Sequence, residues 1–143
     1  SLSRAELAPY AALVANDMRL AGEPMSDAVR RRIWSMVYFS SLFSYGTESR
    51  SAFFALVTPD AHLATFDWLF PRSAMSDSDI PAWRYMRAVF QINAGQADEA
   101  RAELEALLAE LNAAKAEGRI ADRTRQTLAE LSPTTAKPAA KRR

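Results

Sequence analysis

Apolar residues recur at three- and four-residue steps along most of this chain of 143 residues. This spacing predicts amphipathic helices, and no alternating run bounded by turn signals predicts a strand. The four glycines, Gly22, Gly46, Gly95 and Gly118, each fall where an apolar run stops, as expected at helix ends. The sequence therefore predicts an all-α fold: a single-domain bundle or superhelix of about seven helices over residues 1–131.

Capping residues mark where several of the expected helices begin. Ser3 and Glu6 have the spacing of a capping box, in which each side chain satisfies the other residue's free backbone N–H. Ser26 has the position of an N-cap, and Thr58 before Pro59 combines a cap with the residue that favours the first helical position. The helix that begins after Ser3 carries one apolar stripe, formed by Leu7, Tyr10, Ala11, Val14 and Met18.

All Trp, Tyr and Phe residues lie between Tyr10 and Phe90, and the last third of the chain is rich in Ala, Leu, Glu and Arg. Residues 33–43 are apolar on most helical faces, which is typical of a central helix. The densest aromatic cluster comprises Trp34, Tyr38, Phe39, Phe43, Phe53, Phe54, Phe66, Trp68 and Phe70. We expect this cluster to form core, with one of the adjacent Phe53 and Phe54 exposed. A binding surface is expected in the aromatic part rather than in the charged last third.

The charge balance argues against a nucleic-acid-binding domain. The chain has 18 basic and 17 acidic side chains, whereas such a domain usually carries a strongly basic face. It has no cysteine, which excludes disulfides, thiolate metal sites and a cysteine nucleophile. No apolar run reaches the ~20 residues of a membrane helix, and no signal peptide is visible. We expect a cytoplasmic protein that binds no cofactor and no metal.

Residues 82–111 are expected to form two antiparallel helices joined near Gly95. One apolar face comes from Trp83, Met86, Val89 and Phe90, and the other from Ala100, Leu104, Leu107, Leu108 and Leu111. Burial of Trp83 and Phe90 contributes roughly 1.5–3 kcal/mol each. An exposed pair such as Asp98 and Arg101 contributes only ~0.2–0.5 kcal/mol. The apolar faces therefore decide this packing.

The same hairpin resembles a tetratricopeptide repeat. Trp83, Met86 and Phe90 follow the family's order in the first helix, and Gly95, Ala100, Leu104 and Leu107 follow it in the second. Three features depart from the family: one extra residue lies between the helices, Arg87 stands at a small-residue position, and Asn112 lies near the place of the closing proline. No second copy follows at a 34-residue offset. An ordinary helical hairpin with convergent packing is the alternative.

The resemblance implies a concave binding face on the first helix of the hairpin. Arg84, Ala88, Gln91 and Ile92 are then the candidate partner contacts, and Arg84→Glu is expected to spare the fold and weaken binding. The helix over residues 119–131 is expected to be a polar cap, with Ile120 and Leu128 inward and Arg119, Arg123 and Arg125 mostly outward. Pro133, Pro138 and the spaced basic residues predict a disordered basic tail over residues 132–143.

Two further features are candidates for catalysis or for electrostatic binding. His62 is the only histidine and lacks neighbours at ligand spacing, so it is expected to be a surface or half-buried side chain rather than a catalytic base. Arg30, Arg31 and Arg32 are candidate electrostatic contacts for an acidic partner, although consecutive residues spread around a helix and are more typical of a solvated helix end. No glycine-rich phosphate loop or nucleophile motif is present.

These observations favour a non-enzymatic protein–protein interaction module: an adaptor, secretion-type chaperone or assembly factor. Its partner is expected to be a protein or peptide segment that binds an Arg-lined or aromatic-rich groove. The alternative is a small helical protein associated with nucleic acid or ribonucleoprotein, which uses Arg30–Arg32 and the basic tail. A third reading is an enzyme with His62 as general base. The sequence leaves the oligomeric state open.

Overall fold

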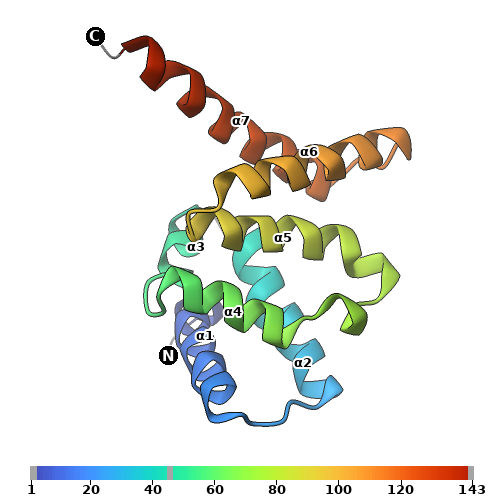
Figure 1. Ribbon diagram of the computed structural model, residues 1–143. Helices are drawn as coiled ribbons and strands as arrows, with labels where there is room; N and C mark the ends of the chain where they lie inside the picture. Colours follow the sequence, from blue (N-terminus) through green and yellow to red (C-terminus); the bar gives the residue numbers. More distant parts are fainter. Residues whose placement is uncertain (1–2, 45–46, 142–143) are drawn as a thin grey trace. The chain divides into compact units, whose positions relative to one another are not determined.

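The computed structural model describes the backbone of residues 3–44 and 47–141 and the side chains of residues 3–43 and 50–131. This part of the chain forms seven α-helices, with shorter helical turns and no strand, which confirms the predicted all-α fold (Figure 1). Contacts within the chain divide it into two compact units, Ser1–Met75 and Ser76–Arg143. The single domain over residues 1–131 stays a prediction. Gly46, Arg142 and Arg143 lie outside the described residues.

The first unit contains α1 (Arg4–Ala21), α2 (Asp27–Ile33), a π-helix (Trp34–Ser44), α3 (Thr47–Phe53), α4 (Pro59–Leu69) and a 3-10 turn (Arg72–Ala74). The predicted capping box is present at the start of α1. The Ser3 hydroxyl accepts from the Glu6 N–H at 3.2 Å, and the Glu6 carboxylate accepts from the Ser3 N–H at 2.7 Å. Ser26 caps α2 by accepting from the Val29 N–H at 3.2 Å.

The second expected helix is continuous from Asp27 to Ser44, but its second half is a π-helix. Its backbone turn is wider than that of an α-helix, because the hydrogen bonds of a π-helix span five residues. The Ser40 hydroxyl also donates to the Ser35 carbonyl, five residues earlier, at 2.9 Å. The apolar pattern of residues 33–43 predicts the central position of this segment but does not predict its π geometry.

Aromatic rings fill the centre of the first unit. Tyr38 of the π-helix is fully buried, with ring centroids 5.2 Å from Phe53, 6.0 Å from Phe66 and 5.1 Å from Phe70. Core packing of the aromatic cluster is confirmed for its buried members, Trp34, Tyr38, Phe43, Phe53, Phe66 and Phe70. Phe54 is half-buried beside the buried Phe53, so the expectation that one of the two is exposed is wrong.

α1 packs against this core through small residues. Ala8, Ala12 and Ala15 are buried, and α1 contacts the π-helix, α3 and α4. A stripe of large apolar residues normally faces the core. In this structure Leu7, Tyr10 and Val14 of the predicted stripe are instead 48%, 55% and 56% exposed. Alanine has no side-chain bulk beyond Cβ, so this face lets α1 approach elements whose aromatic rings already fill the core.

Polar contacts between α1 and α4 fix the rotation of α1. Arg19 Nε donates to Thr65 Oγ1 at 3.0 Å, and its Nη2 donates to Asn16 Oδ1 at 3.0 Å. Thr65 Oγ1 in turn donates to Asn16 Oδ1 at 3.1 Å, and Thr65 is itself buried. If α1 rotated to bury its large apolar residues, this partly buried network would lose its hydrogen bonds.

The second unit contains a 3-10 turn (Asp77–Asp79), α5 (Ile80–Asn93), α6 (Ala97–Ala113) and α7 (Arg119–Lys141). α5 and α6 run side by side and form the expected hairpin (Figure 1). Gly95 in the turn has a φ of 83°, a left-handed conformation that glycine adopts without steric cost. The predicted inward residues Met86, Val89, Phe90, Ala100, Leu104 and Leu107 are buried, whereas Trp83, Leu108 and Leu111 are half-buried.

α7 packs on the hairpin with residues other than those expected. Ala121, Thr124 and Thr127 are its buried side chains, whereas Ile120 and Leu128 are only half-buried. The Tyr85 hydroxyl of α5 lies 2.9 Å from Thr127 Oγ1. Thr124 is satisfied by donating to the Ile120 carbonyl at 2.7 Å. The buried α7 side chains of this contact are therefore small or carry a hydroxyl group, and Tyr85 of α5 is the large side chain.

α7 is also longer than the sequence predicts. It extends through residues 132–141, where Pro133 and Pro138 predict a disordered tail. The alanines and basic residues around these prolines have high helix propensity. The prediction of disorder rests on the prolines and the charges and leaves this propensity out. The side chains of this segment are outside the described residues.

The alanine face of α1 generates a stability test. Ala12→Leu is expected to lower the free energy of unfolding by about 1–3 kcal/mol, because the larger side chain does not fit the close helix contact. Val14→Ala is expected to change it by less than about 0.5 kcal/mol, since Val14 is mainly exposed. Urea unfolding followed by circular dichroism measures both values. A larger loss for Val14→Ala than for Ala12→Leu would contradict this orientation of α1.

Candidate functional site

An exposed row of large apolar residues on α1 is the candidate site. Leu7, Tyr10 and Val14, named here the α1 stripe, are spaced by three and four residues and so lie along one side of the helix. The buried alanines occupy the opposite side. Single exposed apolar residues are ordinary on protein surfaces, but an aligned row on one helix is typical of a docking surface. The stripe is therefore a candidate protein-binding surface.

Charged residues border the α1 stripe unequally. Glu6 and Asp17 are exposed and lie eleven residues apart, about three helical turns, on the same edge of the stripe. Hydrogen bonds from Ser3 lower the pKa of Glu6, so its carboxylate is charged at neutral pH. Arg4 lies near the other edge, and Arg19 points toward Thr65 and Asn16 instead. One edge of the stripe is therefore acidic.

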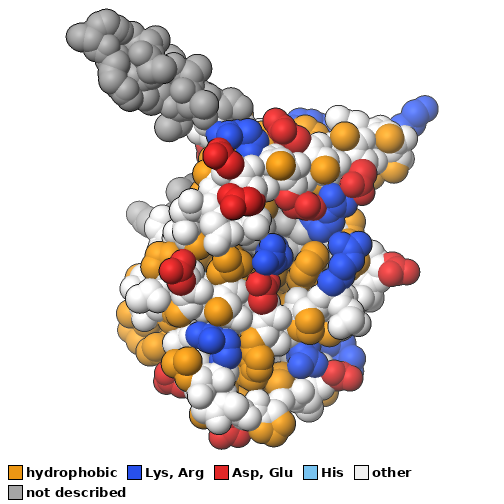
Figure 2. Space-filling view, in the orientation of Figure 1, with side chains coloured by type: hydrophobic (Ala, Val, Ile, Leu, Met, Phe, Trp, Pro, Cys, Tyr) orange, Lys and Arg blue, Asp and Glu red, His pale blue; other side chains and the backbone are white. Residues whose placement is uncertain are grey.

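The face drawn in Figure 2 shows apolar surface among charged side chains. Hydrophobic atoms lie between isolated acidic and basic groups over the region that Figure 1 shows as α1 to α4. Acidic side chains predominate along α6, where Arg101 is the one basic residue among Asp98, Glu99, Glu103, Glu105 and Glu110. In the sequence as a whole, neither sign of charge dominates.

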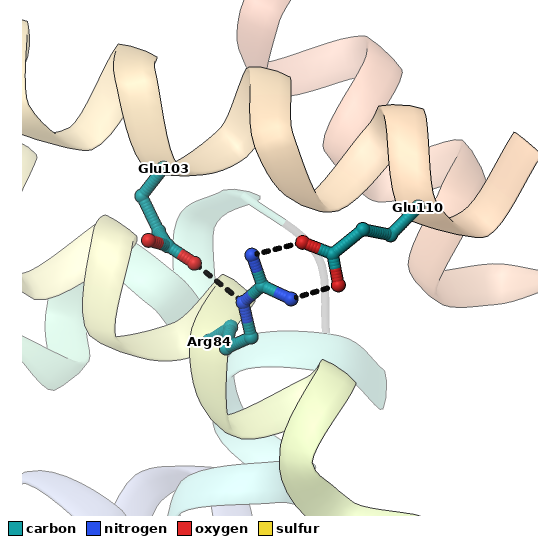
Figure 3. Close-up of polar contacts among 3 residues, drawn as sticks. All are labelled: Arg84, Glu103 and Glu110. Carbon is teal, nitrogen blue, oxygen red and sulfur yellow. Dashed lines mark hydrogen bonds and ion pairs between the residues drawn. The ribbon is translucent and has the colours of Figure 1, made fainter.

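Arg84, the first of the predicted partner contacts, binds within the hairpin. Its Nε donates to Glu103 Oε2, and its Nη1 and Nη2 donate to the two carboxylate oxygens of Glu110 at 2.7 and 3.0 Å (Figure 3). The guanidinium joins α5 to two residues of α6 that lie about two helical turns apart, and the Arg84 side chain is only 14% exposed. The hydrogen bonds to Glu110 are the main reason that the pKa of Arg84 is raised. This geometry gives Arg84 a structural role that the sequence does not reveal.

The other predicted contacts on α5 differ in their exposure. Ala88 is fully buried, and Gln91 and Ile92 are half-buried. The structure thus does not bring the four residues together as one open surface. Binding by this helix stays a prediction.

The arginine run of α2 separates into one internal and two external residues. Arg30 donates to the Leu69 carbonyl at the end of α4 and to Asp27 Oδ1 at 2.8 Å. Arg31 and Arg32 are exposed, and within the described part of the chain neither side chain forms an ion pair. Of the arginine run, only these two residues remain accessible to an acidic partner. The side chains of Lys137 and Lys141 in the tail lie outside the described residues.

His62 is buried, which corrects the expected surface or half-buried position. It is 1% exposed and its ring stacks on Phe53, with centroids 5.5 Å apart, while Phe54 contacts it edge-on at 5.2 Å. Burial lowers the pKa of His62 to about 4. Among the described residues, no group of three or more His, Asp or Glu side chains could hold a metal ion. None of the described helices is long and apolar enough to cross a membrane.

The sequence contains a signal for the orientation of α1 that periodicity alone does not resolve. Ala8, Ala12 and Ala15 have helical spacing as regular as that of the stripe. Two apolar faces of different size therefore compete for the core on one helix. Hydrophobicity favours burial of the larger residues, whereas the limited space beside the aromatic core favours burial of the alanines.

The ion pairs of Arg84 generate a test of its structural role. Arg84→Met is expected to lower the free energy of unfolding by about 1–2 kcal/mol, because it leaves two carboxylates without their shared cation but near solvent. Arg84→Glu should lower the free energy of unfolding by more than Arg84→Met does. This changes the expectation that Arg84→Glu spares the fold. Adding Glu110→Arg to Arg84→Glu should restore part of the loss in urea unfolding.

Arg125→Met is the matched control, because the Arg125 side chain is 42% exposed and its acidic partners are more exposed still. It should cost less than about 1 kcal/mol. Equal losses for Arg84→Met and Arg125→Met would show that Arg84 does not join the two helices.

His62 predicts a pH dependence of stability. Its pKa of about 4 in the folded chain lies below the unfolded value, near 6.5, so the unfolded chain binds the proton more readily. The contribution of neutral His62 is fully present above pH 6.5 and is lost as the pH falls through about 4. The slope in this window should approach about 1.4 kcal/mol per pH unit.

The measurement is urea unfolding of the wild type and of His62→Gln between neutral and acidic pH. The difference between the two curves isolates this residue from the carboxylates that titrate in the same window. Parallel curves over the whole window would contradict the buried, neutral state of His62.

Comparison with known proteins finds no relative of this chain. No family model matches the chain, and no match is found among curated proteins or among solved structures. A proposal about function therefore rests on the described residues themselves. The exposed α1 stripe is one feature of these residues to which the packing of the chain gives no role.

Proposed function

We propose that the protein is a non-enzymatic protein–protein interaction module that binds its partner through the α1 stripe. The observation that carries this proposal is the exposure of Leu7, Tyr10 and Val14 while the alanines of the same helix are buried. An adaptor, a secretion-type chaperone or an assembly factor fits this description. A cytoplasmic location and a tetratricopeptide-like hairpin are part of the proposal; the α5–α6 pairing supports the hairpin.

Physical magnitudes support docking on the α1 stripe. Complete burial of a large apolar side chain contributes roughly 1.5–3 kcal/mol. Each stripe residue is about half exposed, so a partner that covers all of them gains roughly 1 kcal/mol from each. Tyrosine is also enriched among residues that dominate binding energy, because its ring is large and rigid. The site thus has a central aromatic residue, Tyr10, with an aliphatic residue on either side.

The nucleic-acid reading differs from this proposal in its dependence on salt. Arg31 and Arg32 are the accessible arginines of the run, and phosphate contacts through such residues weaken steeply as salt rises. Apolar docking on α1 does not weaken in that way. A partner retained on the α1 stripe at high salt supports the proposal over the alternative.

A photo-crosslinking experiment tests the proposed function. A photoreactive benzoylphenylalanine replaces Tyr10 in the full chain, and irradiation in cells should yield a covalent adduct with a protein. The matched control carries the same group in place of Glu105, which is exposed on α6. Adding Leu7→Glu to the first variant should remove the adduct. If position 10 gave no adduct beyond that of position 105, the α1 stripe would not be a binding surface.

A further inference from the structure

A second helix of the first unit exposes an apolar face with the same spacing as the α1 stripe. Val29 is 45% and Met36 is 42% exposed. Arg32 is exposed and lies between them, three residues after Val29 and four before Met36. These residues, named here the α2 face, therefore lie along one side of the segment formed by α2 and the start of the π-helix.

The two faces carry opposite charge. Asp17 and Glu6 border one edge of the α1 stripe and Arg4 lies near the other, whereas Arg32 lies within the α2 face. Arg31 lies roughly 160° from Val29 around the helix and therefore points away from the α2 face. Arg30 is excluded from this surface because it binds Asp27 and the Leu69 carbonyl. Within the described residues no ion pair inside the chain neutralises Asp17, Arg31 or Arg32. Each face thus presents apolar residues beside a charge, Asp17 or Arg32, that forms no ion pair within the described part of its own chain.

Antiparallel pairing of a face with itself is unfavourable. Two α1 helices that meet antiparallel about a two-fold axis bring their equivalent edges together, which places Glu6 and Asp17 of one copy near those of the other. Two α2 faces would bring the central Arg32 residues of the two copies together in the same way. Like charges held close at an interface suppress association. The complementary pairing is that of an α1 stripe with an α2 face.

The middle residues of the two faces also match. Tyr10 is central in the α1 stripe, and Arg32 is central in the α2 face. A guanidinium group stacks favourably on an aromatic ring, and the aliphatic residues on either side can then pack against one another. Asp17 lies at the edge of the stripe from which its carboxylate can reach Arg32. Spacing, charge and side-chain type therefore agree.

We propose that the occupant of the α1 stripe is a second copy of this chain, whose α2 face docks on it. This inference rests on the proposed function, because it names the partner of the same surface. Two such contacts related by a two-fold axis give a closed dimer, whereas one contact repeated head to tail gives an open chain of copies. In both cases each copy uses its α1 stripe and its α2 face. In the closed dimer both contact the same copy, whereas in the open chain they contact two different copies.

A mixing experiment tests the pairing of unlike faces. Sedimentation velocity of the purified full chain should show a mass that rises with concentration. Leu7→Glu spoils the α1 stripe and Val29→Glu spoils the α2 face, so each variant alone should sediment as a monomer. An equimolar mixture should associate again, because one intact stripe meets one intact α2 face. A mixture that stays monomeric would overturn the proposal, and so would a wild type that is monomeric at every concentration.

A charge exchange tests the same contact without apolar changes. Asp17→Lys or Arg32→Glu alone should weaken association at least about tenfold at low salt, and the two together in one chain should recover most of it. Glu99→Lys, on the exposed side of α6, is the control and should leave association unchanged. Circular dichroism and urea unfolding confirm that each variant is folded. Association that survives both single reversals would overturn the proposed pairing.

The outcomes separate this inference from the proposed function. A monomeric wild type together with an adduct between position 10 and a different protein would refute self-association and leave the interaction module standing. An adduct whose partner is the chain itself, with restored association in the mixture, supports both. Absence of any adduct at position 10 would remove both together.

Discussion

The contact between the alanine face of α1 and the aromatic core determines the surface of the first unit. Ala8, Ala12 and Ala15 are buried there, and the ring cluster around Tyr38 occupies the space that larger α1 residues would need. The Arg19–Thr65–Asn16 network holds α1 in this rotation. Because one face of the helix is fixed, the opposite face, with Leu7, Tyr10 and Val14, is directed outward. The proposed binding surface is a consequence of how the core is packed.

The second unit uses a different balance of forces. Buried apolar residues from both helices close the α5–α6 hairpin, and Arg84 joins the helices with hydrogen bonds to two carboxylates at its edge. The residue expected to recognise a partner is thus engaged in the fold. The shape of a tetratricopeptide-like hairpin and the availability of its groove residues are separate properties, and resemblance at the apolar positions bears only on the first.

Much of the fold follows from the sequence. The helical class, the caps at Ser3 and Ser26, the turn at Gly95 and the aromatic core each depend on short-range spacing or on residues of one kind. The orientation of α1, the burial of His62 and the partners of Arg84 depend on residues distant in the sequence. Periodicity shows that a helix has an apolar face, but only the volume available beside it decides which of two faces is buried.

The proposed binding surface requires that the α1 stripe faces outward, and because the chain has no native cysteine this direction can be measured with single cysteine substitutions. Single cysteines replace Leu7, Tyr10, Val14, Ala8, Ala12 and Ala15 in turn, and their rates of reaction with a maleimide are compared in the folded and urea-unfolded chain. Low protein concentration keeps self-association from covering the surface. An outward-facing stripe predicts rates close to the unfolded value for Leu7→Cys, Tyr10→Cys and Val14→Cys and strong protection for the alanine positions. Protection of the stripe and rapid reaction at Ala8, Ala12 and Ala15 would contradict it.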